Sequence, residues 1–306
     1  MVNKEKIIED MSDDLYQFLK RRADNKANNQ YYAGSSIHCS ALDSCVRQVV
    51  LGYFKFPKKD LTIAELLMFE IANFCHRLMA DWARQSDKFE MIGEEYDLTE
   101  GLPENVSGKC DIVIEHKKSG TKILNDTKTA MPSAFKQYSQ YLVKRSHELQ
   151  GGTYKYGLKN LGTLIDLVVF TYFDRGGTNA PIYVAMSEVS DEVIENTIDI
   201  YREAIKDYKH TKKLPAKEPL IFEVKGDNIY VKKSWQCDYC KFCDISCKGY
   251  PEFDRKKAVK VGTISDGIFC VFDNFYQLEN ELKEQYYKQN KTDDDFYNFV
   301  KGVSGK

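Results

Sequence analysis

The sequence predicts an α/β fold in which helices flank a mixed central β-sheet. Helical and strand-like segments alternate along residues 61–208, and the strand-like segments are short and rich in β-branched residues. Composition supports a globular chain, since 42% of the 306 residues are hydrophobic, 29% are charged and the formal net charge is -2. These values exclude collagen-like and wholly disordered classes. The near-zero charge gives no global sign of nucleic-acid binding, so any such contact must come from a local basic patch.

Helical periodicity dominates the first part of the chain. The first 30 residues are polar and predict a helical segment, and residues 61–84 contain neither Gly nor Pro. Five apolar residues in 61–84 recur at three- and four-residue spacing, which predicts that they form the buried face of a helix: Leu67, Ile71, Phe74, Leu78 and Trp82.

Two strands and a tight turn follow. Residues 108–115 (GKCDIVIE) and 122–129 (KILNDTKT) predict strands, and the turn at 118–121 between them predicts a hairpin. Residues 164–173 (LIDLVVFTYF) are typical of a buried strand, and residues 182–186 predict another.

Further helices complete the predicted core. Residues 132–160 have a helical pattern, although Gly151 and Gly152 argue against one continuous helix. Ser190 is expected to cap an amphipathic helix with the apolar positions Ile194, Ile198, Tyr201, Ile205 and Tyr208. The last 55 residues are expected to form an appended element with a helix around 274–289. We therefore expect an N-terminal helical part (1–60), a core (61–215), a cysteine segment (216–251) and a C-terminal appendage (252–306).

The expected location is the cytoplasm. No apolar run approaches the roughly 20 residues of a membrane helix, and the N-terminus is too charged for a secretory signal. The chain has nine cysteines, and four of them (Cys237, Cys240, Cys243 and Cys247) fall within 11 residues. Because the cytoplasm keeps thiols reduced, this cluster favours metal binding over disulfides.

Charged residues stand beside the apolar runs of the predicted hairpin. Asp126 and Lys128 are two residues apart, so their side chains project from the same face of a strand. The hairpin would bring Asp111 beside them. Two converging carboxylates suit a hard cation such as Mg²⁺, and a nearby lysine can orient water or neutralise a phosphate.

These segments resemble the PD-(D/E)XK nuclease superfamily, and most closely its RecB-like members, which include the iron–sulfur exonucleases of CRISPR adaptation modules and their viral relatives. The family's successive motifs read here as SGKCD, NDTKT and LQGGTY, preceded by a helical histidine in NFCHRLMADW. The resemblance spans roughly residues 35–250 and implies a restriction-endonuclease-like core.

The resemblance also implies roles for individual residues. His76, Asp111 and Asp126 would bind Mg²⁺ or Mn²⁺, and Lys128 would be the catalytic lysine. Gln150 would hold that lysine or the DNA, and Tyr154 would face the substrate or support its helix. Asp126 stands where Glu is common, which could shift the metal preference. The remaining histidines are expected at the surface: His38, His116, His147 and His210.

The cysteines admit two interpretations. The clustered four could form a zinc knuckle, although they would be cramped around one tetrahedral ion, or three of them could join a distant cysteine. The segment SALDSCVRQVVLGYF resembles the first-cysteine motif of RecB-like iron–sulfur nucleases. This resemblance implies a structural [4Fe–4S] cluster on Cys45, Cys237, Cys240 and Cys247, with Cys243 as an alternative ligand and Cys39 as a weaker alternative to Cys45. Cys75, Cys110 and Cys270 are expected to be core thiols.

The resulting hypothesis is a metal-dependent DNA exonuclease that acts on single strands or DNA ends, in recombination, repair or CRISPR-type DNA processing. Homo-oligomers or protein partners from those pathways are compatible with it. The alternatives are a DNA-binding or assembly module whose cleavage depends on a partner, and a zinc-binding nucleic-acid-binding protein. Several basic and aromatic residues form either a DNA track or an ordinary solvated helix face: Lys136, Tyr138, Tyr141, Lys144, Arg145, Lys155 and Lys159.

Overall fold

The computed structural model describes residues 17–18, 20–21, 36–140, 142–186, 189–218, 221–225, 228–232, 234–243, 245–247 and 259–263. Tyr141, Cys270 and the expected helix at 274–289 lie outside the described residues, as does most of the first 30-residue segment. The chain divides into two compact units. Unit 1 consists of residues 1–55 and 60–214, and unit 2 consists of residues 56–59 and 215–306.

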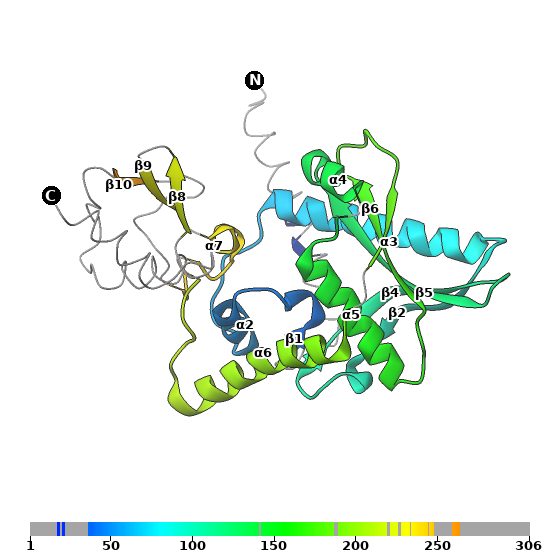
Figure 1. The fold of residues 1–306 in the computed structure, drawn as a ribbon, viewed down its shortest axis with the longest axis horizontal. Coiled ribbons are helices and arrows are strands. Elements are labelled where there is room, and N and C mark those ends of the chain that lie inside the picture. Colours follow the sequence, from blue (N-terminus) through cyan, green and yellow to red (C-terminus); the bar gives the residue numbers. More distant parts are fainter. Residues whose placement is uncertain are drawn as a thin grey trace, which may run out of the picture. The chain divides into compact units, whose positions relative to one another are not determined.

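A five-stranded mixed sheet forms the centre of unit 1 (Figure 1). Its strand order is β2 (Phe89–Asp97), β4 (Lys109–His116), β5 (Thr121–Ala130), β6 (Leu167–Asp174) and β7 (Ile182–Ala185). Only β5 and β6 are parallel, and the other neighbouring pairs are antiparallel. The predicted mixed sheet and the hairpin of β4 and β5 are therefore confirmed. The edge strand β2 was not expected from the sequence.

Helices cover both faces of this sheet (Figure 1). On one face, α3 (Ile63–Gln85) packs Met79, Ala80 and Ala83 on a cluster that includes Ile123. The next residue of β5, Leu124, belongs to the main core, which also receives α4 (Pro132–Tyr138) and α5 (Arg145–Asn160). Since successive strand residues point to opposite faces, α3 lies on one side of the sheet, and α4 and α5 lie on the other.

The predicted buried face of α3 is wrong. A capping box of Thr62 and Glu65 starts the helix where the pattern indicated, but the side chains that face the protein are Leu66, Cys75, Met79, Ala80 and Ala83. The five residues that were expected to be buried are exposed: Leu67, Ile71, Phe74, Leu78 and Trp82. Both sides of α3 are apolar, and the small Ala80 and Ala83 let the sheet approach on theirs.

The two glycines of the third helical segment do not interrupt a helix. Gly151 and Gly152 lie inside α5, and the break falls instead between the end of α4 and the start of α5. A Cβ atom on Gly151 would lie 2.9 Å from Phe170 Cζ, and one on Gly152 would lie 3.1 Å from Ile194 Cδ1. The glycines therefore allow α5 to pack closely between the sheet and the next helix.

That next helix is α6 (Asp191–Thr211), which is capped by Ser190 as predicted: the Val193 N–H donates to Ser190 Oγ at 3.4 Å. Its predicted apolar residues Ile194, Ile198, Tyr201 and Ile205 are buried. The remaining elements of unit 1 are β1 (Ile37–His38), the 3-10 turn η1 (Cys39–Ala41), α2 (Val46–Tyr53), the 3-10 turn η2 (Thr99–Gly101) and β3 (Val106–Ser107), where β1 and β3 pair in parallel.

Unit 2 contains a small antiparallel sheet that the sequence did not predict. It consists of β8 (Ile221–Lys225), β9 (Asn228–Lys232) and β10 (Val259–Thr263), and the short helix α7 (Trp235–Tyr239) follows β9. The segment 56–59 joins this unit, because the Lys59 N–H donates to the Lys241 carbonyl at 2.8 Å. None of the helices within the described ranges is long and apolar enough to cross a membrane.

Candidate active site

The candidate site lies where β4 and β5 separate. Their paired residues end at Ile112 opposite Asn125, and Asp111 and Asp126 are the next residues on the two strands. Asp111 Oδ2 accepts a hydrogen bond of 2.6 Å from the Thr127 N–H, so its carboxylate joins the two strands just beyond their last paired residues. The hairpin thus brings both predicted aspartates to one point of the sheet.

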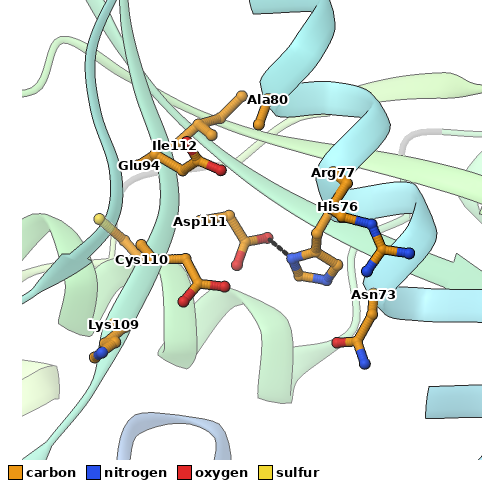
Figure 2. A pocket seen from close by; sticks show the side chains of 10 residues that line it. Asn73, His76, Arg77, Ala80, Glu94, Lys109, Cys110, Asp111 and Ile112 are labelled. Carbon is orange, nitrogen blue, oxygen red and sulfur yellow. Dashed lines mark ion pairs between the residues drawn. The ribbon is translucent and has the colours of Figure 1, made fainter. Parts of the chain in front are cut away.

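His76 reaches the same point from α3. Its Nδ1 lies 3.1 Å from Asp111 Oδ2 (Figure 2). His76 projects from the side of α3 that faces the sheet, next to Met79 and Ala80. The structure therefore brings two of the three predicted metal ligands, His76 of α3 and Asp111 of β4, into direct contact.

Lys128 connects Asp126 to α5. Its Nζ lies 2.7 Å from Asp126 Oδ2 and donates to Gln150 Oε1 at 2.8 Å. Gln150 Nε2 in turn donates to the Tyr154 hydroxyl at 2.7 Å. Gln150 therefore contacts the lysine, one of the two roles that the resemblance implied for it. Tyr154 is buried in the main core.

The glycine of the SGKCD motif has a steric role. A Cβ atom on Gly108 would lie 2.5 Å from Cys39 Sγ and 3.2 Å from Tyr154 Cε1. Gly108 therefore lets β4 begin against η1 and α5, three residues before Asp111. Cys39 is buried in this core.

Gly108→Ala is expected to destabilise the protein by about 1–3 kcal/mol, because the added methyl overpacks this junction. Thermal unfolding of Gly108→Ala, Cys39→Ala and the double variant measures the coupling. We expect the double variant to recover part of the loss, since Cys39→Ala removes the closest atom. Strictly additive losses would contradict the packing described here.

Asp126 is a buried carboxylate whose charge is poorly compensated. It is 1% exposed, and its Oδ2 contacts Lys128 without hydrogen-bond geometry, which leaves that buried oxygen without a donor. Burial raises the pKa of Asp126 to about 6, and the charge of Asp111 adds to this, although Lys128 opposes it. A buried carboxylate with an unused oxygen beside a second carboxylate is a setting that a cation stabilises.

The pKa values of His76 and Asp111 shift in opposite directions because the two side chains interact. Burial by itself lowers the pKa of His76, but its hydrogen bond to Asp111 and the two aspartate charges raise it overall. Burial likewise raises the pKa of Asp111, but His76, Lys128 and the Thr127 N–H lower it overall. The pair therefore favours a protonated His76 beside an ionised Asp111 in the metal-free protein.

Metal-free protein is expected to lose stability as pH rises from 5 to 8. The raised pKa values of Asp126 and His76 mean that their proton-dependent stabilisation is complete at low pH and is lost as pH rises through those values. The lowered pKa of Asp111 has the opposite sign, but its contribution is lost only below the ordinary aspartate range. Melting temperatures in EDTA across this range test this, and a rising melting temperature would contradict it.

A pocket of about 330 Å³ opens beside Asp111 and His76 (Figure 2). Asn73 and Arg77 line it from α3, Lys109 lines it from β4, and Glu94 and Glu95 line it from β2. The two cationic side chains lie near the carboxylates, which suits an anionic ligand next to a metal site.

His147 is the site neighbour that the sequence did not reveal. It was expected at the surface, but it is half-buried and its Nδ1 lies 2.8 Å from the Tyr172 hydroxyl. Burial lowers the pKa of His147 to about 3, with further contributions from Lys128 and Lys144. Its position three residues before Gln150 on α5, and so on a neighbouring part of the helix surface, was the available signal. His38 and His116 are also half-buried, and His210 is exposed.

The residues of the expected basic track lie in different environments. Lys136, Lys144 and Arg145 are exposed near the start of α5, whereas Lys159 pairs with Asp191 of α6 at 2.6 Å. Tyr138 is buried and stacks on Tyr172 with ring centroids 4.1 Å apart, so it is a core residue. These positions leave the first three basic side chains as candidates for phosphate contacts.

The clustered cysteines belong to unit 2, and Cys45 precedes α2 in unit 1. Burial raises the pKa of Cys240, while hydrogen bonds from the backbone N–H groups of Phe242 and Cys243 and the charge of Lys59 act against it. Such donors stabilise a thiolate. Cys243 is buried, and Cys75 and Cys110 are buried as predicted. None of the eight cysteines that the structure describes forms a disulfide.

Neither candidate metal site is complete as a set of converging ligands. Among the residues that the structure describes, no three His, Cys, Asp or Glu side chains form a group that could hold a metal ion. At the hairpin site, the buried and unsatisfied Asp126 Oδ2 and the adjacent Asp111 fit a divalent cation chemically. In unit 2, the N–H donors around Cys240 fit a metal-bound thiolate.

No protein-family model and no curated protein matches this chain. Among solved structures, the crystal structure of SSO0001 is similar over 76% of this chain and 96% of its own, with 16% identity and a TM-score of 0.47. An alkaline exonuclease, LHK-Exo from Laribacter hongkongensis, is similar over 58% of this chain and 92% of its own, with 8% identity and a TM-score of 0.40. LHK-Exo in complex with dAMP covers 58% of this chain and 94% of its own, with 11% identity and a TM-score of 0.38. Each of these similarities covers only part of this chain.

Proposed function

We propose that this chain is a metal-dependent DNA nuclease with a restriction-endonuclease-like core, acting as an exonuclease on single strands or DNA ends. The observation that carries the proposal is the junction of β4 and β5, where Asp111, Asp126 and Lys128 meet and Gln150 holds the lysine. Buried like-charged carboxylates beside an ordered lysine are costly for stability, and such arrangements are typical of functional sites.

His76, Asp111 and Asp126 would hold the Mg²⁺ or Mn²⁺ ion. When bound, the ion would polarise the phosphodiester and favour a hydroxide nucleophile. Asp126 would give up its close contact with Lys128 in order to face the cation. Gln150 would keep the Lys128 ammonium group in place, where its positive charge stabilises the charge that develops on the phosphate oxygens. Lys109 would bind a flanking phosphate in the pocket.

The test is cleavage of end-labelled single- and double-stranded DNA with Mg²⁺, with Mn²⁺ and with EDTA. Asp111→Asn is the informative variant, because it keeps the shape of the side chain and removes the charge. Asp199→Asn on the exposed side of α6 is the matched control. We expect metal-dependent cleavage by the wild type and the control alone. Equal cleavage by Asp111→Asn would overturn the assignment.

The second candidate is a DNA-binding or assembly module whose cleavage depends on a partner protein of a recombination, repair or CRISPR-type pathway. The observation in its favour is that the described His and Asp side chains do not yet converge as a ligand group. Tight DNA binding without cleavage under any metal would favour this candidate.

We further propose a structural [4Fe–4S] cluster on Cys45, Cys237, Cys240 and Cys247. The grouping of four cysteines within 11 residues supports a metal centre in this segment. Anaerobically purified protein is expected to be brown and to contain iron, and Cys240→Ser is expected to lose that iron and to lower the melting temperature. Cys75→Ser is the control. Colourless protein with stoichiometric zinc would instead support a zinc-binding protein.

A further inference from the structure

The outer side of α3 carries a continuous apolar stripe, which we call the outer stripe. Exposure is greatest at its centre and declines toward its ends: Leu67 43%, Ile71 45%, Phe74 57%, Leu78 45% and Trp82 39%. Met68 beside it is 38% exposed. The stripe therefore covers most of a helix that is 23 residues, or about 34 Å, long.

Packing against the sheet accounts only for the Trp82 end of this stripe, where the Trp82 ring lies 5.5 Å from the Phe89 ring of β2. The sheet side of α3 is already occupied by Met79, Ala80 and Ala83, and His76 projects from that side toward Asp111. At 100° per residue, Phe74 and Leu78 lie on the opposite side of the helix. Half-exposed side chains of this size make an apolar patch on the order of 500 Å², near the upper limit for the surface of a monomer.

The residues around the stripe favour a protein over a nucleic acid as its occupant. No cationic side chain interrupts the stripe, and its border carries Glu70 and Asp81 as well as Arg77 and Arg84. Arg84 pairs with Asp81 at 2.7 Å, which neutralises that part of the border. A surface that binds nucleic acid needs an excess of positive charge, which this border lacks.

The spacing of the stripe suits a second copy of the same helix. Leu67, Ile71, Phe74 and Leu78 follow steps of four, three and four residues, which is the seam of a coiled coil. Glu70 and Arg77 each precede one of the inner positions Ile71 and Leu78, so they flank the same edge of the seam. In an antiparallel pair of these helices, equivalent edges face each other, and Glu70 of one copy lies opposite Arg77 of the other.

We propose that α3 forms an antiparallel homodimer through the outer stripe, with two symmetric Glu70–Arg77 ion pairs between the copies. Two such helices would bury on the order of 1,000 Å² in total, which reaches the lower range of specific interfaces. Since His76 projects away from the seam, both candidate active sites stay accessible in the dimer. This inference does not depend on the proposed nuclease activity.

Sedimentation velocity of the full chain over a wide concentration range tests the proposal. We expect a reversible dimer whose dissociation constant rises about 30-fold or more in Phe74→Lys, equivalent to about 2 kcal/mol. Ile71→Lys is a second variant with the same expectation. Because both side chains are exposed, the melting temperature extrapolated to the monomer should be unchanged. A wild type that is monomeric throughout, or a dimer that both lysine variants leave intact, would overturn the proposal.

Charge exchange tests the orientation. Glu70→Arg and Arg77→Glu are each expected to weaken the dimer about three- to tenfold, because each places like charges opposite each other. The double variant restores opposite charges and should recover wild-type affinity. Glu203→Arg on α6 is the charge-matched control. A double variant that is weaker than both single variants would exclude the antiparallel arrangement.

Discussion

Lys128→Met is expected to lower the rate of DNA cleavage by about 1,000-fold, with little change in DNA binding. The methionine keeps the length of the side chain but removes the ammonium group that lies between Asp126 and Gln150. Losing a preorganised charge that acts mainly in the transition state reduces turnover more than affinity. Single-turnover cleavage and equilibrium binding in Ca²⁺ separate the two effects.

Lys128→Arg distinguishes between two roles for this charge. If Lys128 only neutralised Asp126, the arginine variant would stay active. We expect it to be nearly as inactive as the methionine variant, because a guanidinium is larger and cannot take the place of a compact ammonium group held by Gln150. Lys206→Met, at an exposed position of α6, is the matched control. Full activity of Lys128→Met would refute a catalytic role for the lysine.

Asp126→Asn is expected to abolish cleavage while it stabilises the metal-free protein. The raised pKa of Asp126, about 6, shows that the fold disfavours its charged form. A neutral amide of the same shape removes this cost, which is about 3 kcal/mol at pH 8. We therefore expect a higher melting temperature in EDTA at pH 8, a smaller difference at pH 5, and loss of stabilisation by Mn²⁺.

The metal response separates this expectation from a simple packing effect. Wild type should gain melting temperature with Mn²⁺ at pH 8, since a ligand that binds only the folded state stabilises it. Asp126→Asn should gain little, and Asp199→Asn should behave like wild type. An Asp126→Asn variant that is less stable than wild type in EDTA at pH 8 would show that the Lys128 contact outweighs the burial of the carboxylate.

The sequence predicted the parts of the fold that local periodicity determines. The hairpin of β4 and β5 has apolar strands and a polar turn, and α6 has both a cap and an apolar face, so both were predicted. The edge strand β2 was missed because most of its residues are exposed and four of the nine are charged, which obscures any apolar alternation. Periodicity also could not choose between the two apolar sides of α3, because that choice depends on the sheet.

In the candidate site, too, local spacing revealed some residues and missed those whose position depends on other elements. Period-two spacing was enough to place Asp126 and Lys128 on one face. Gln150 and Tyr154 were singled out only by the family resemblance, and their mutual hydrogen bond was not predicted. His147 was missed because its burial depends on Tyr138 and Tyr172, which come from two other elements. Gly151 is needed for the close approach of α5 to the sheet, but in the sequence alone a glycine at this position indicates a helix break.

The composition of unit 2 has a consequence for the order of folding during synthesis. Its segment 56–59 leaves the ribosome long before residues 215–306, to which Lys59 is hydrogen-bonded through Lys241. Unit 1, in contrast, has its whole sheet once β7 has emerged. Domains generally fold as units as they are translated. The segment before α3 therefore gains this hydrogen bond only after Lys241 has been translated, when the strands of the sheet in unit 1 are already complete.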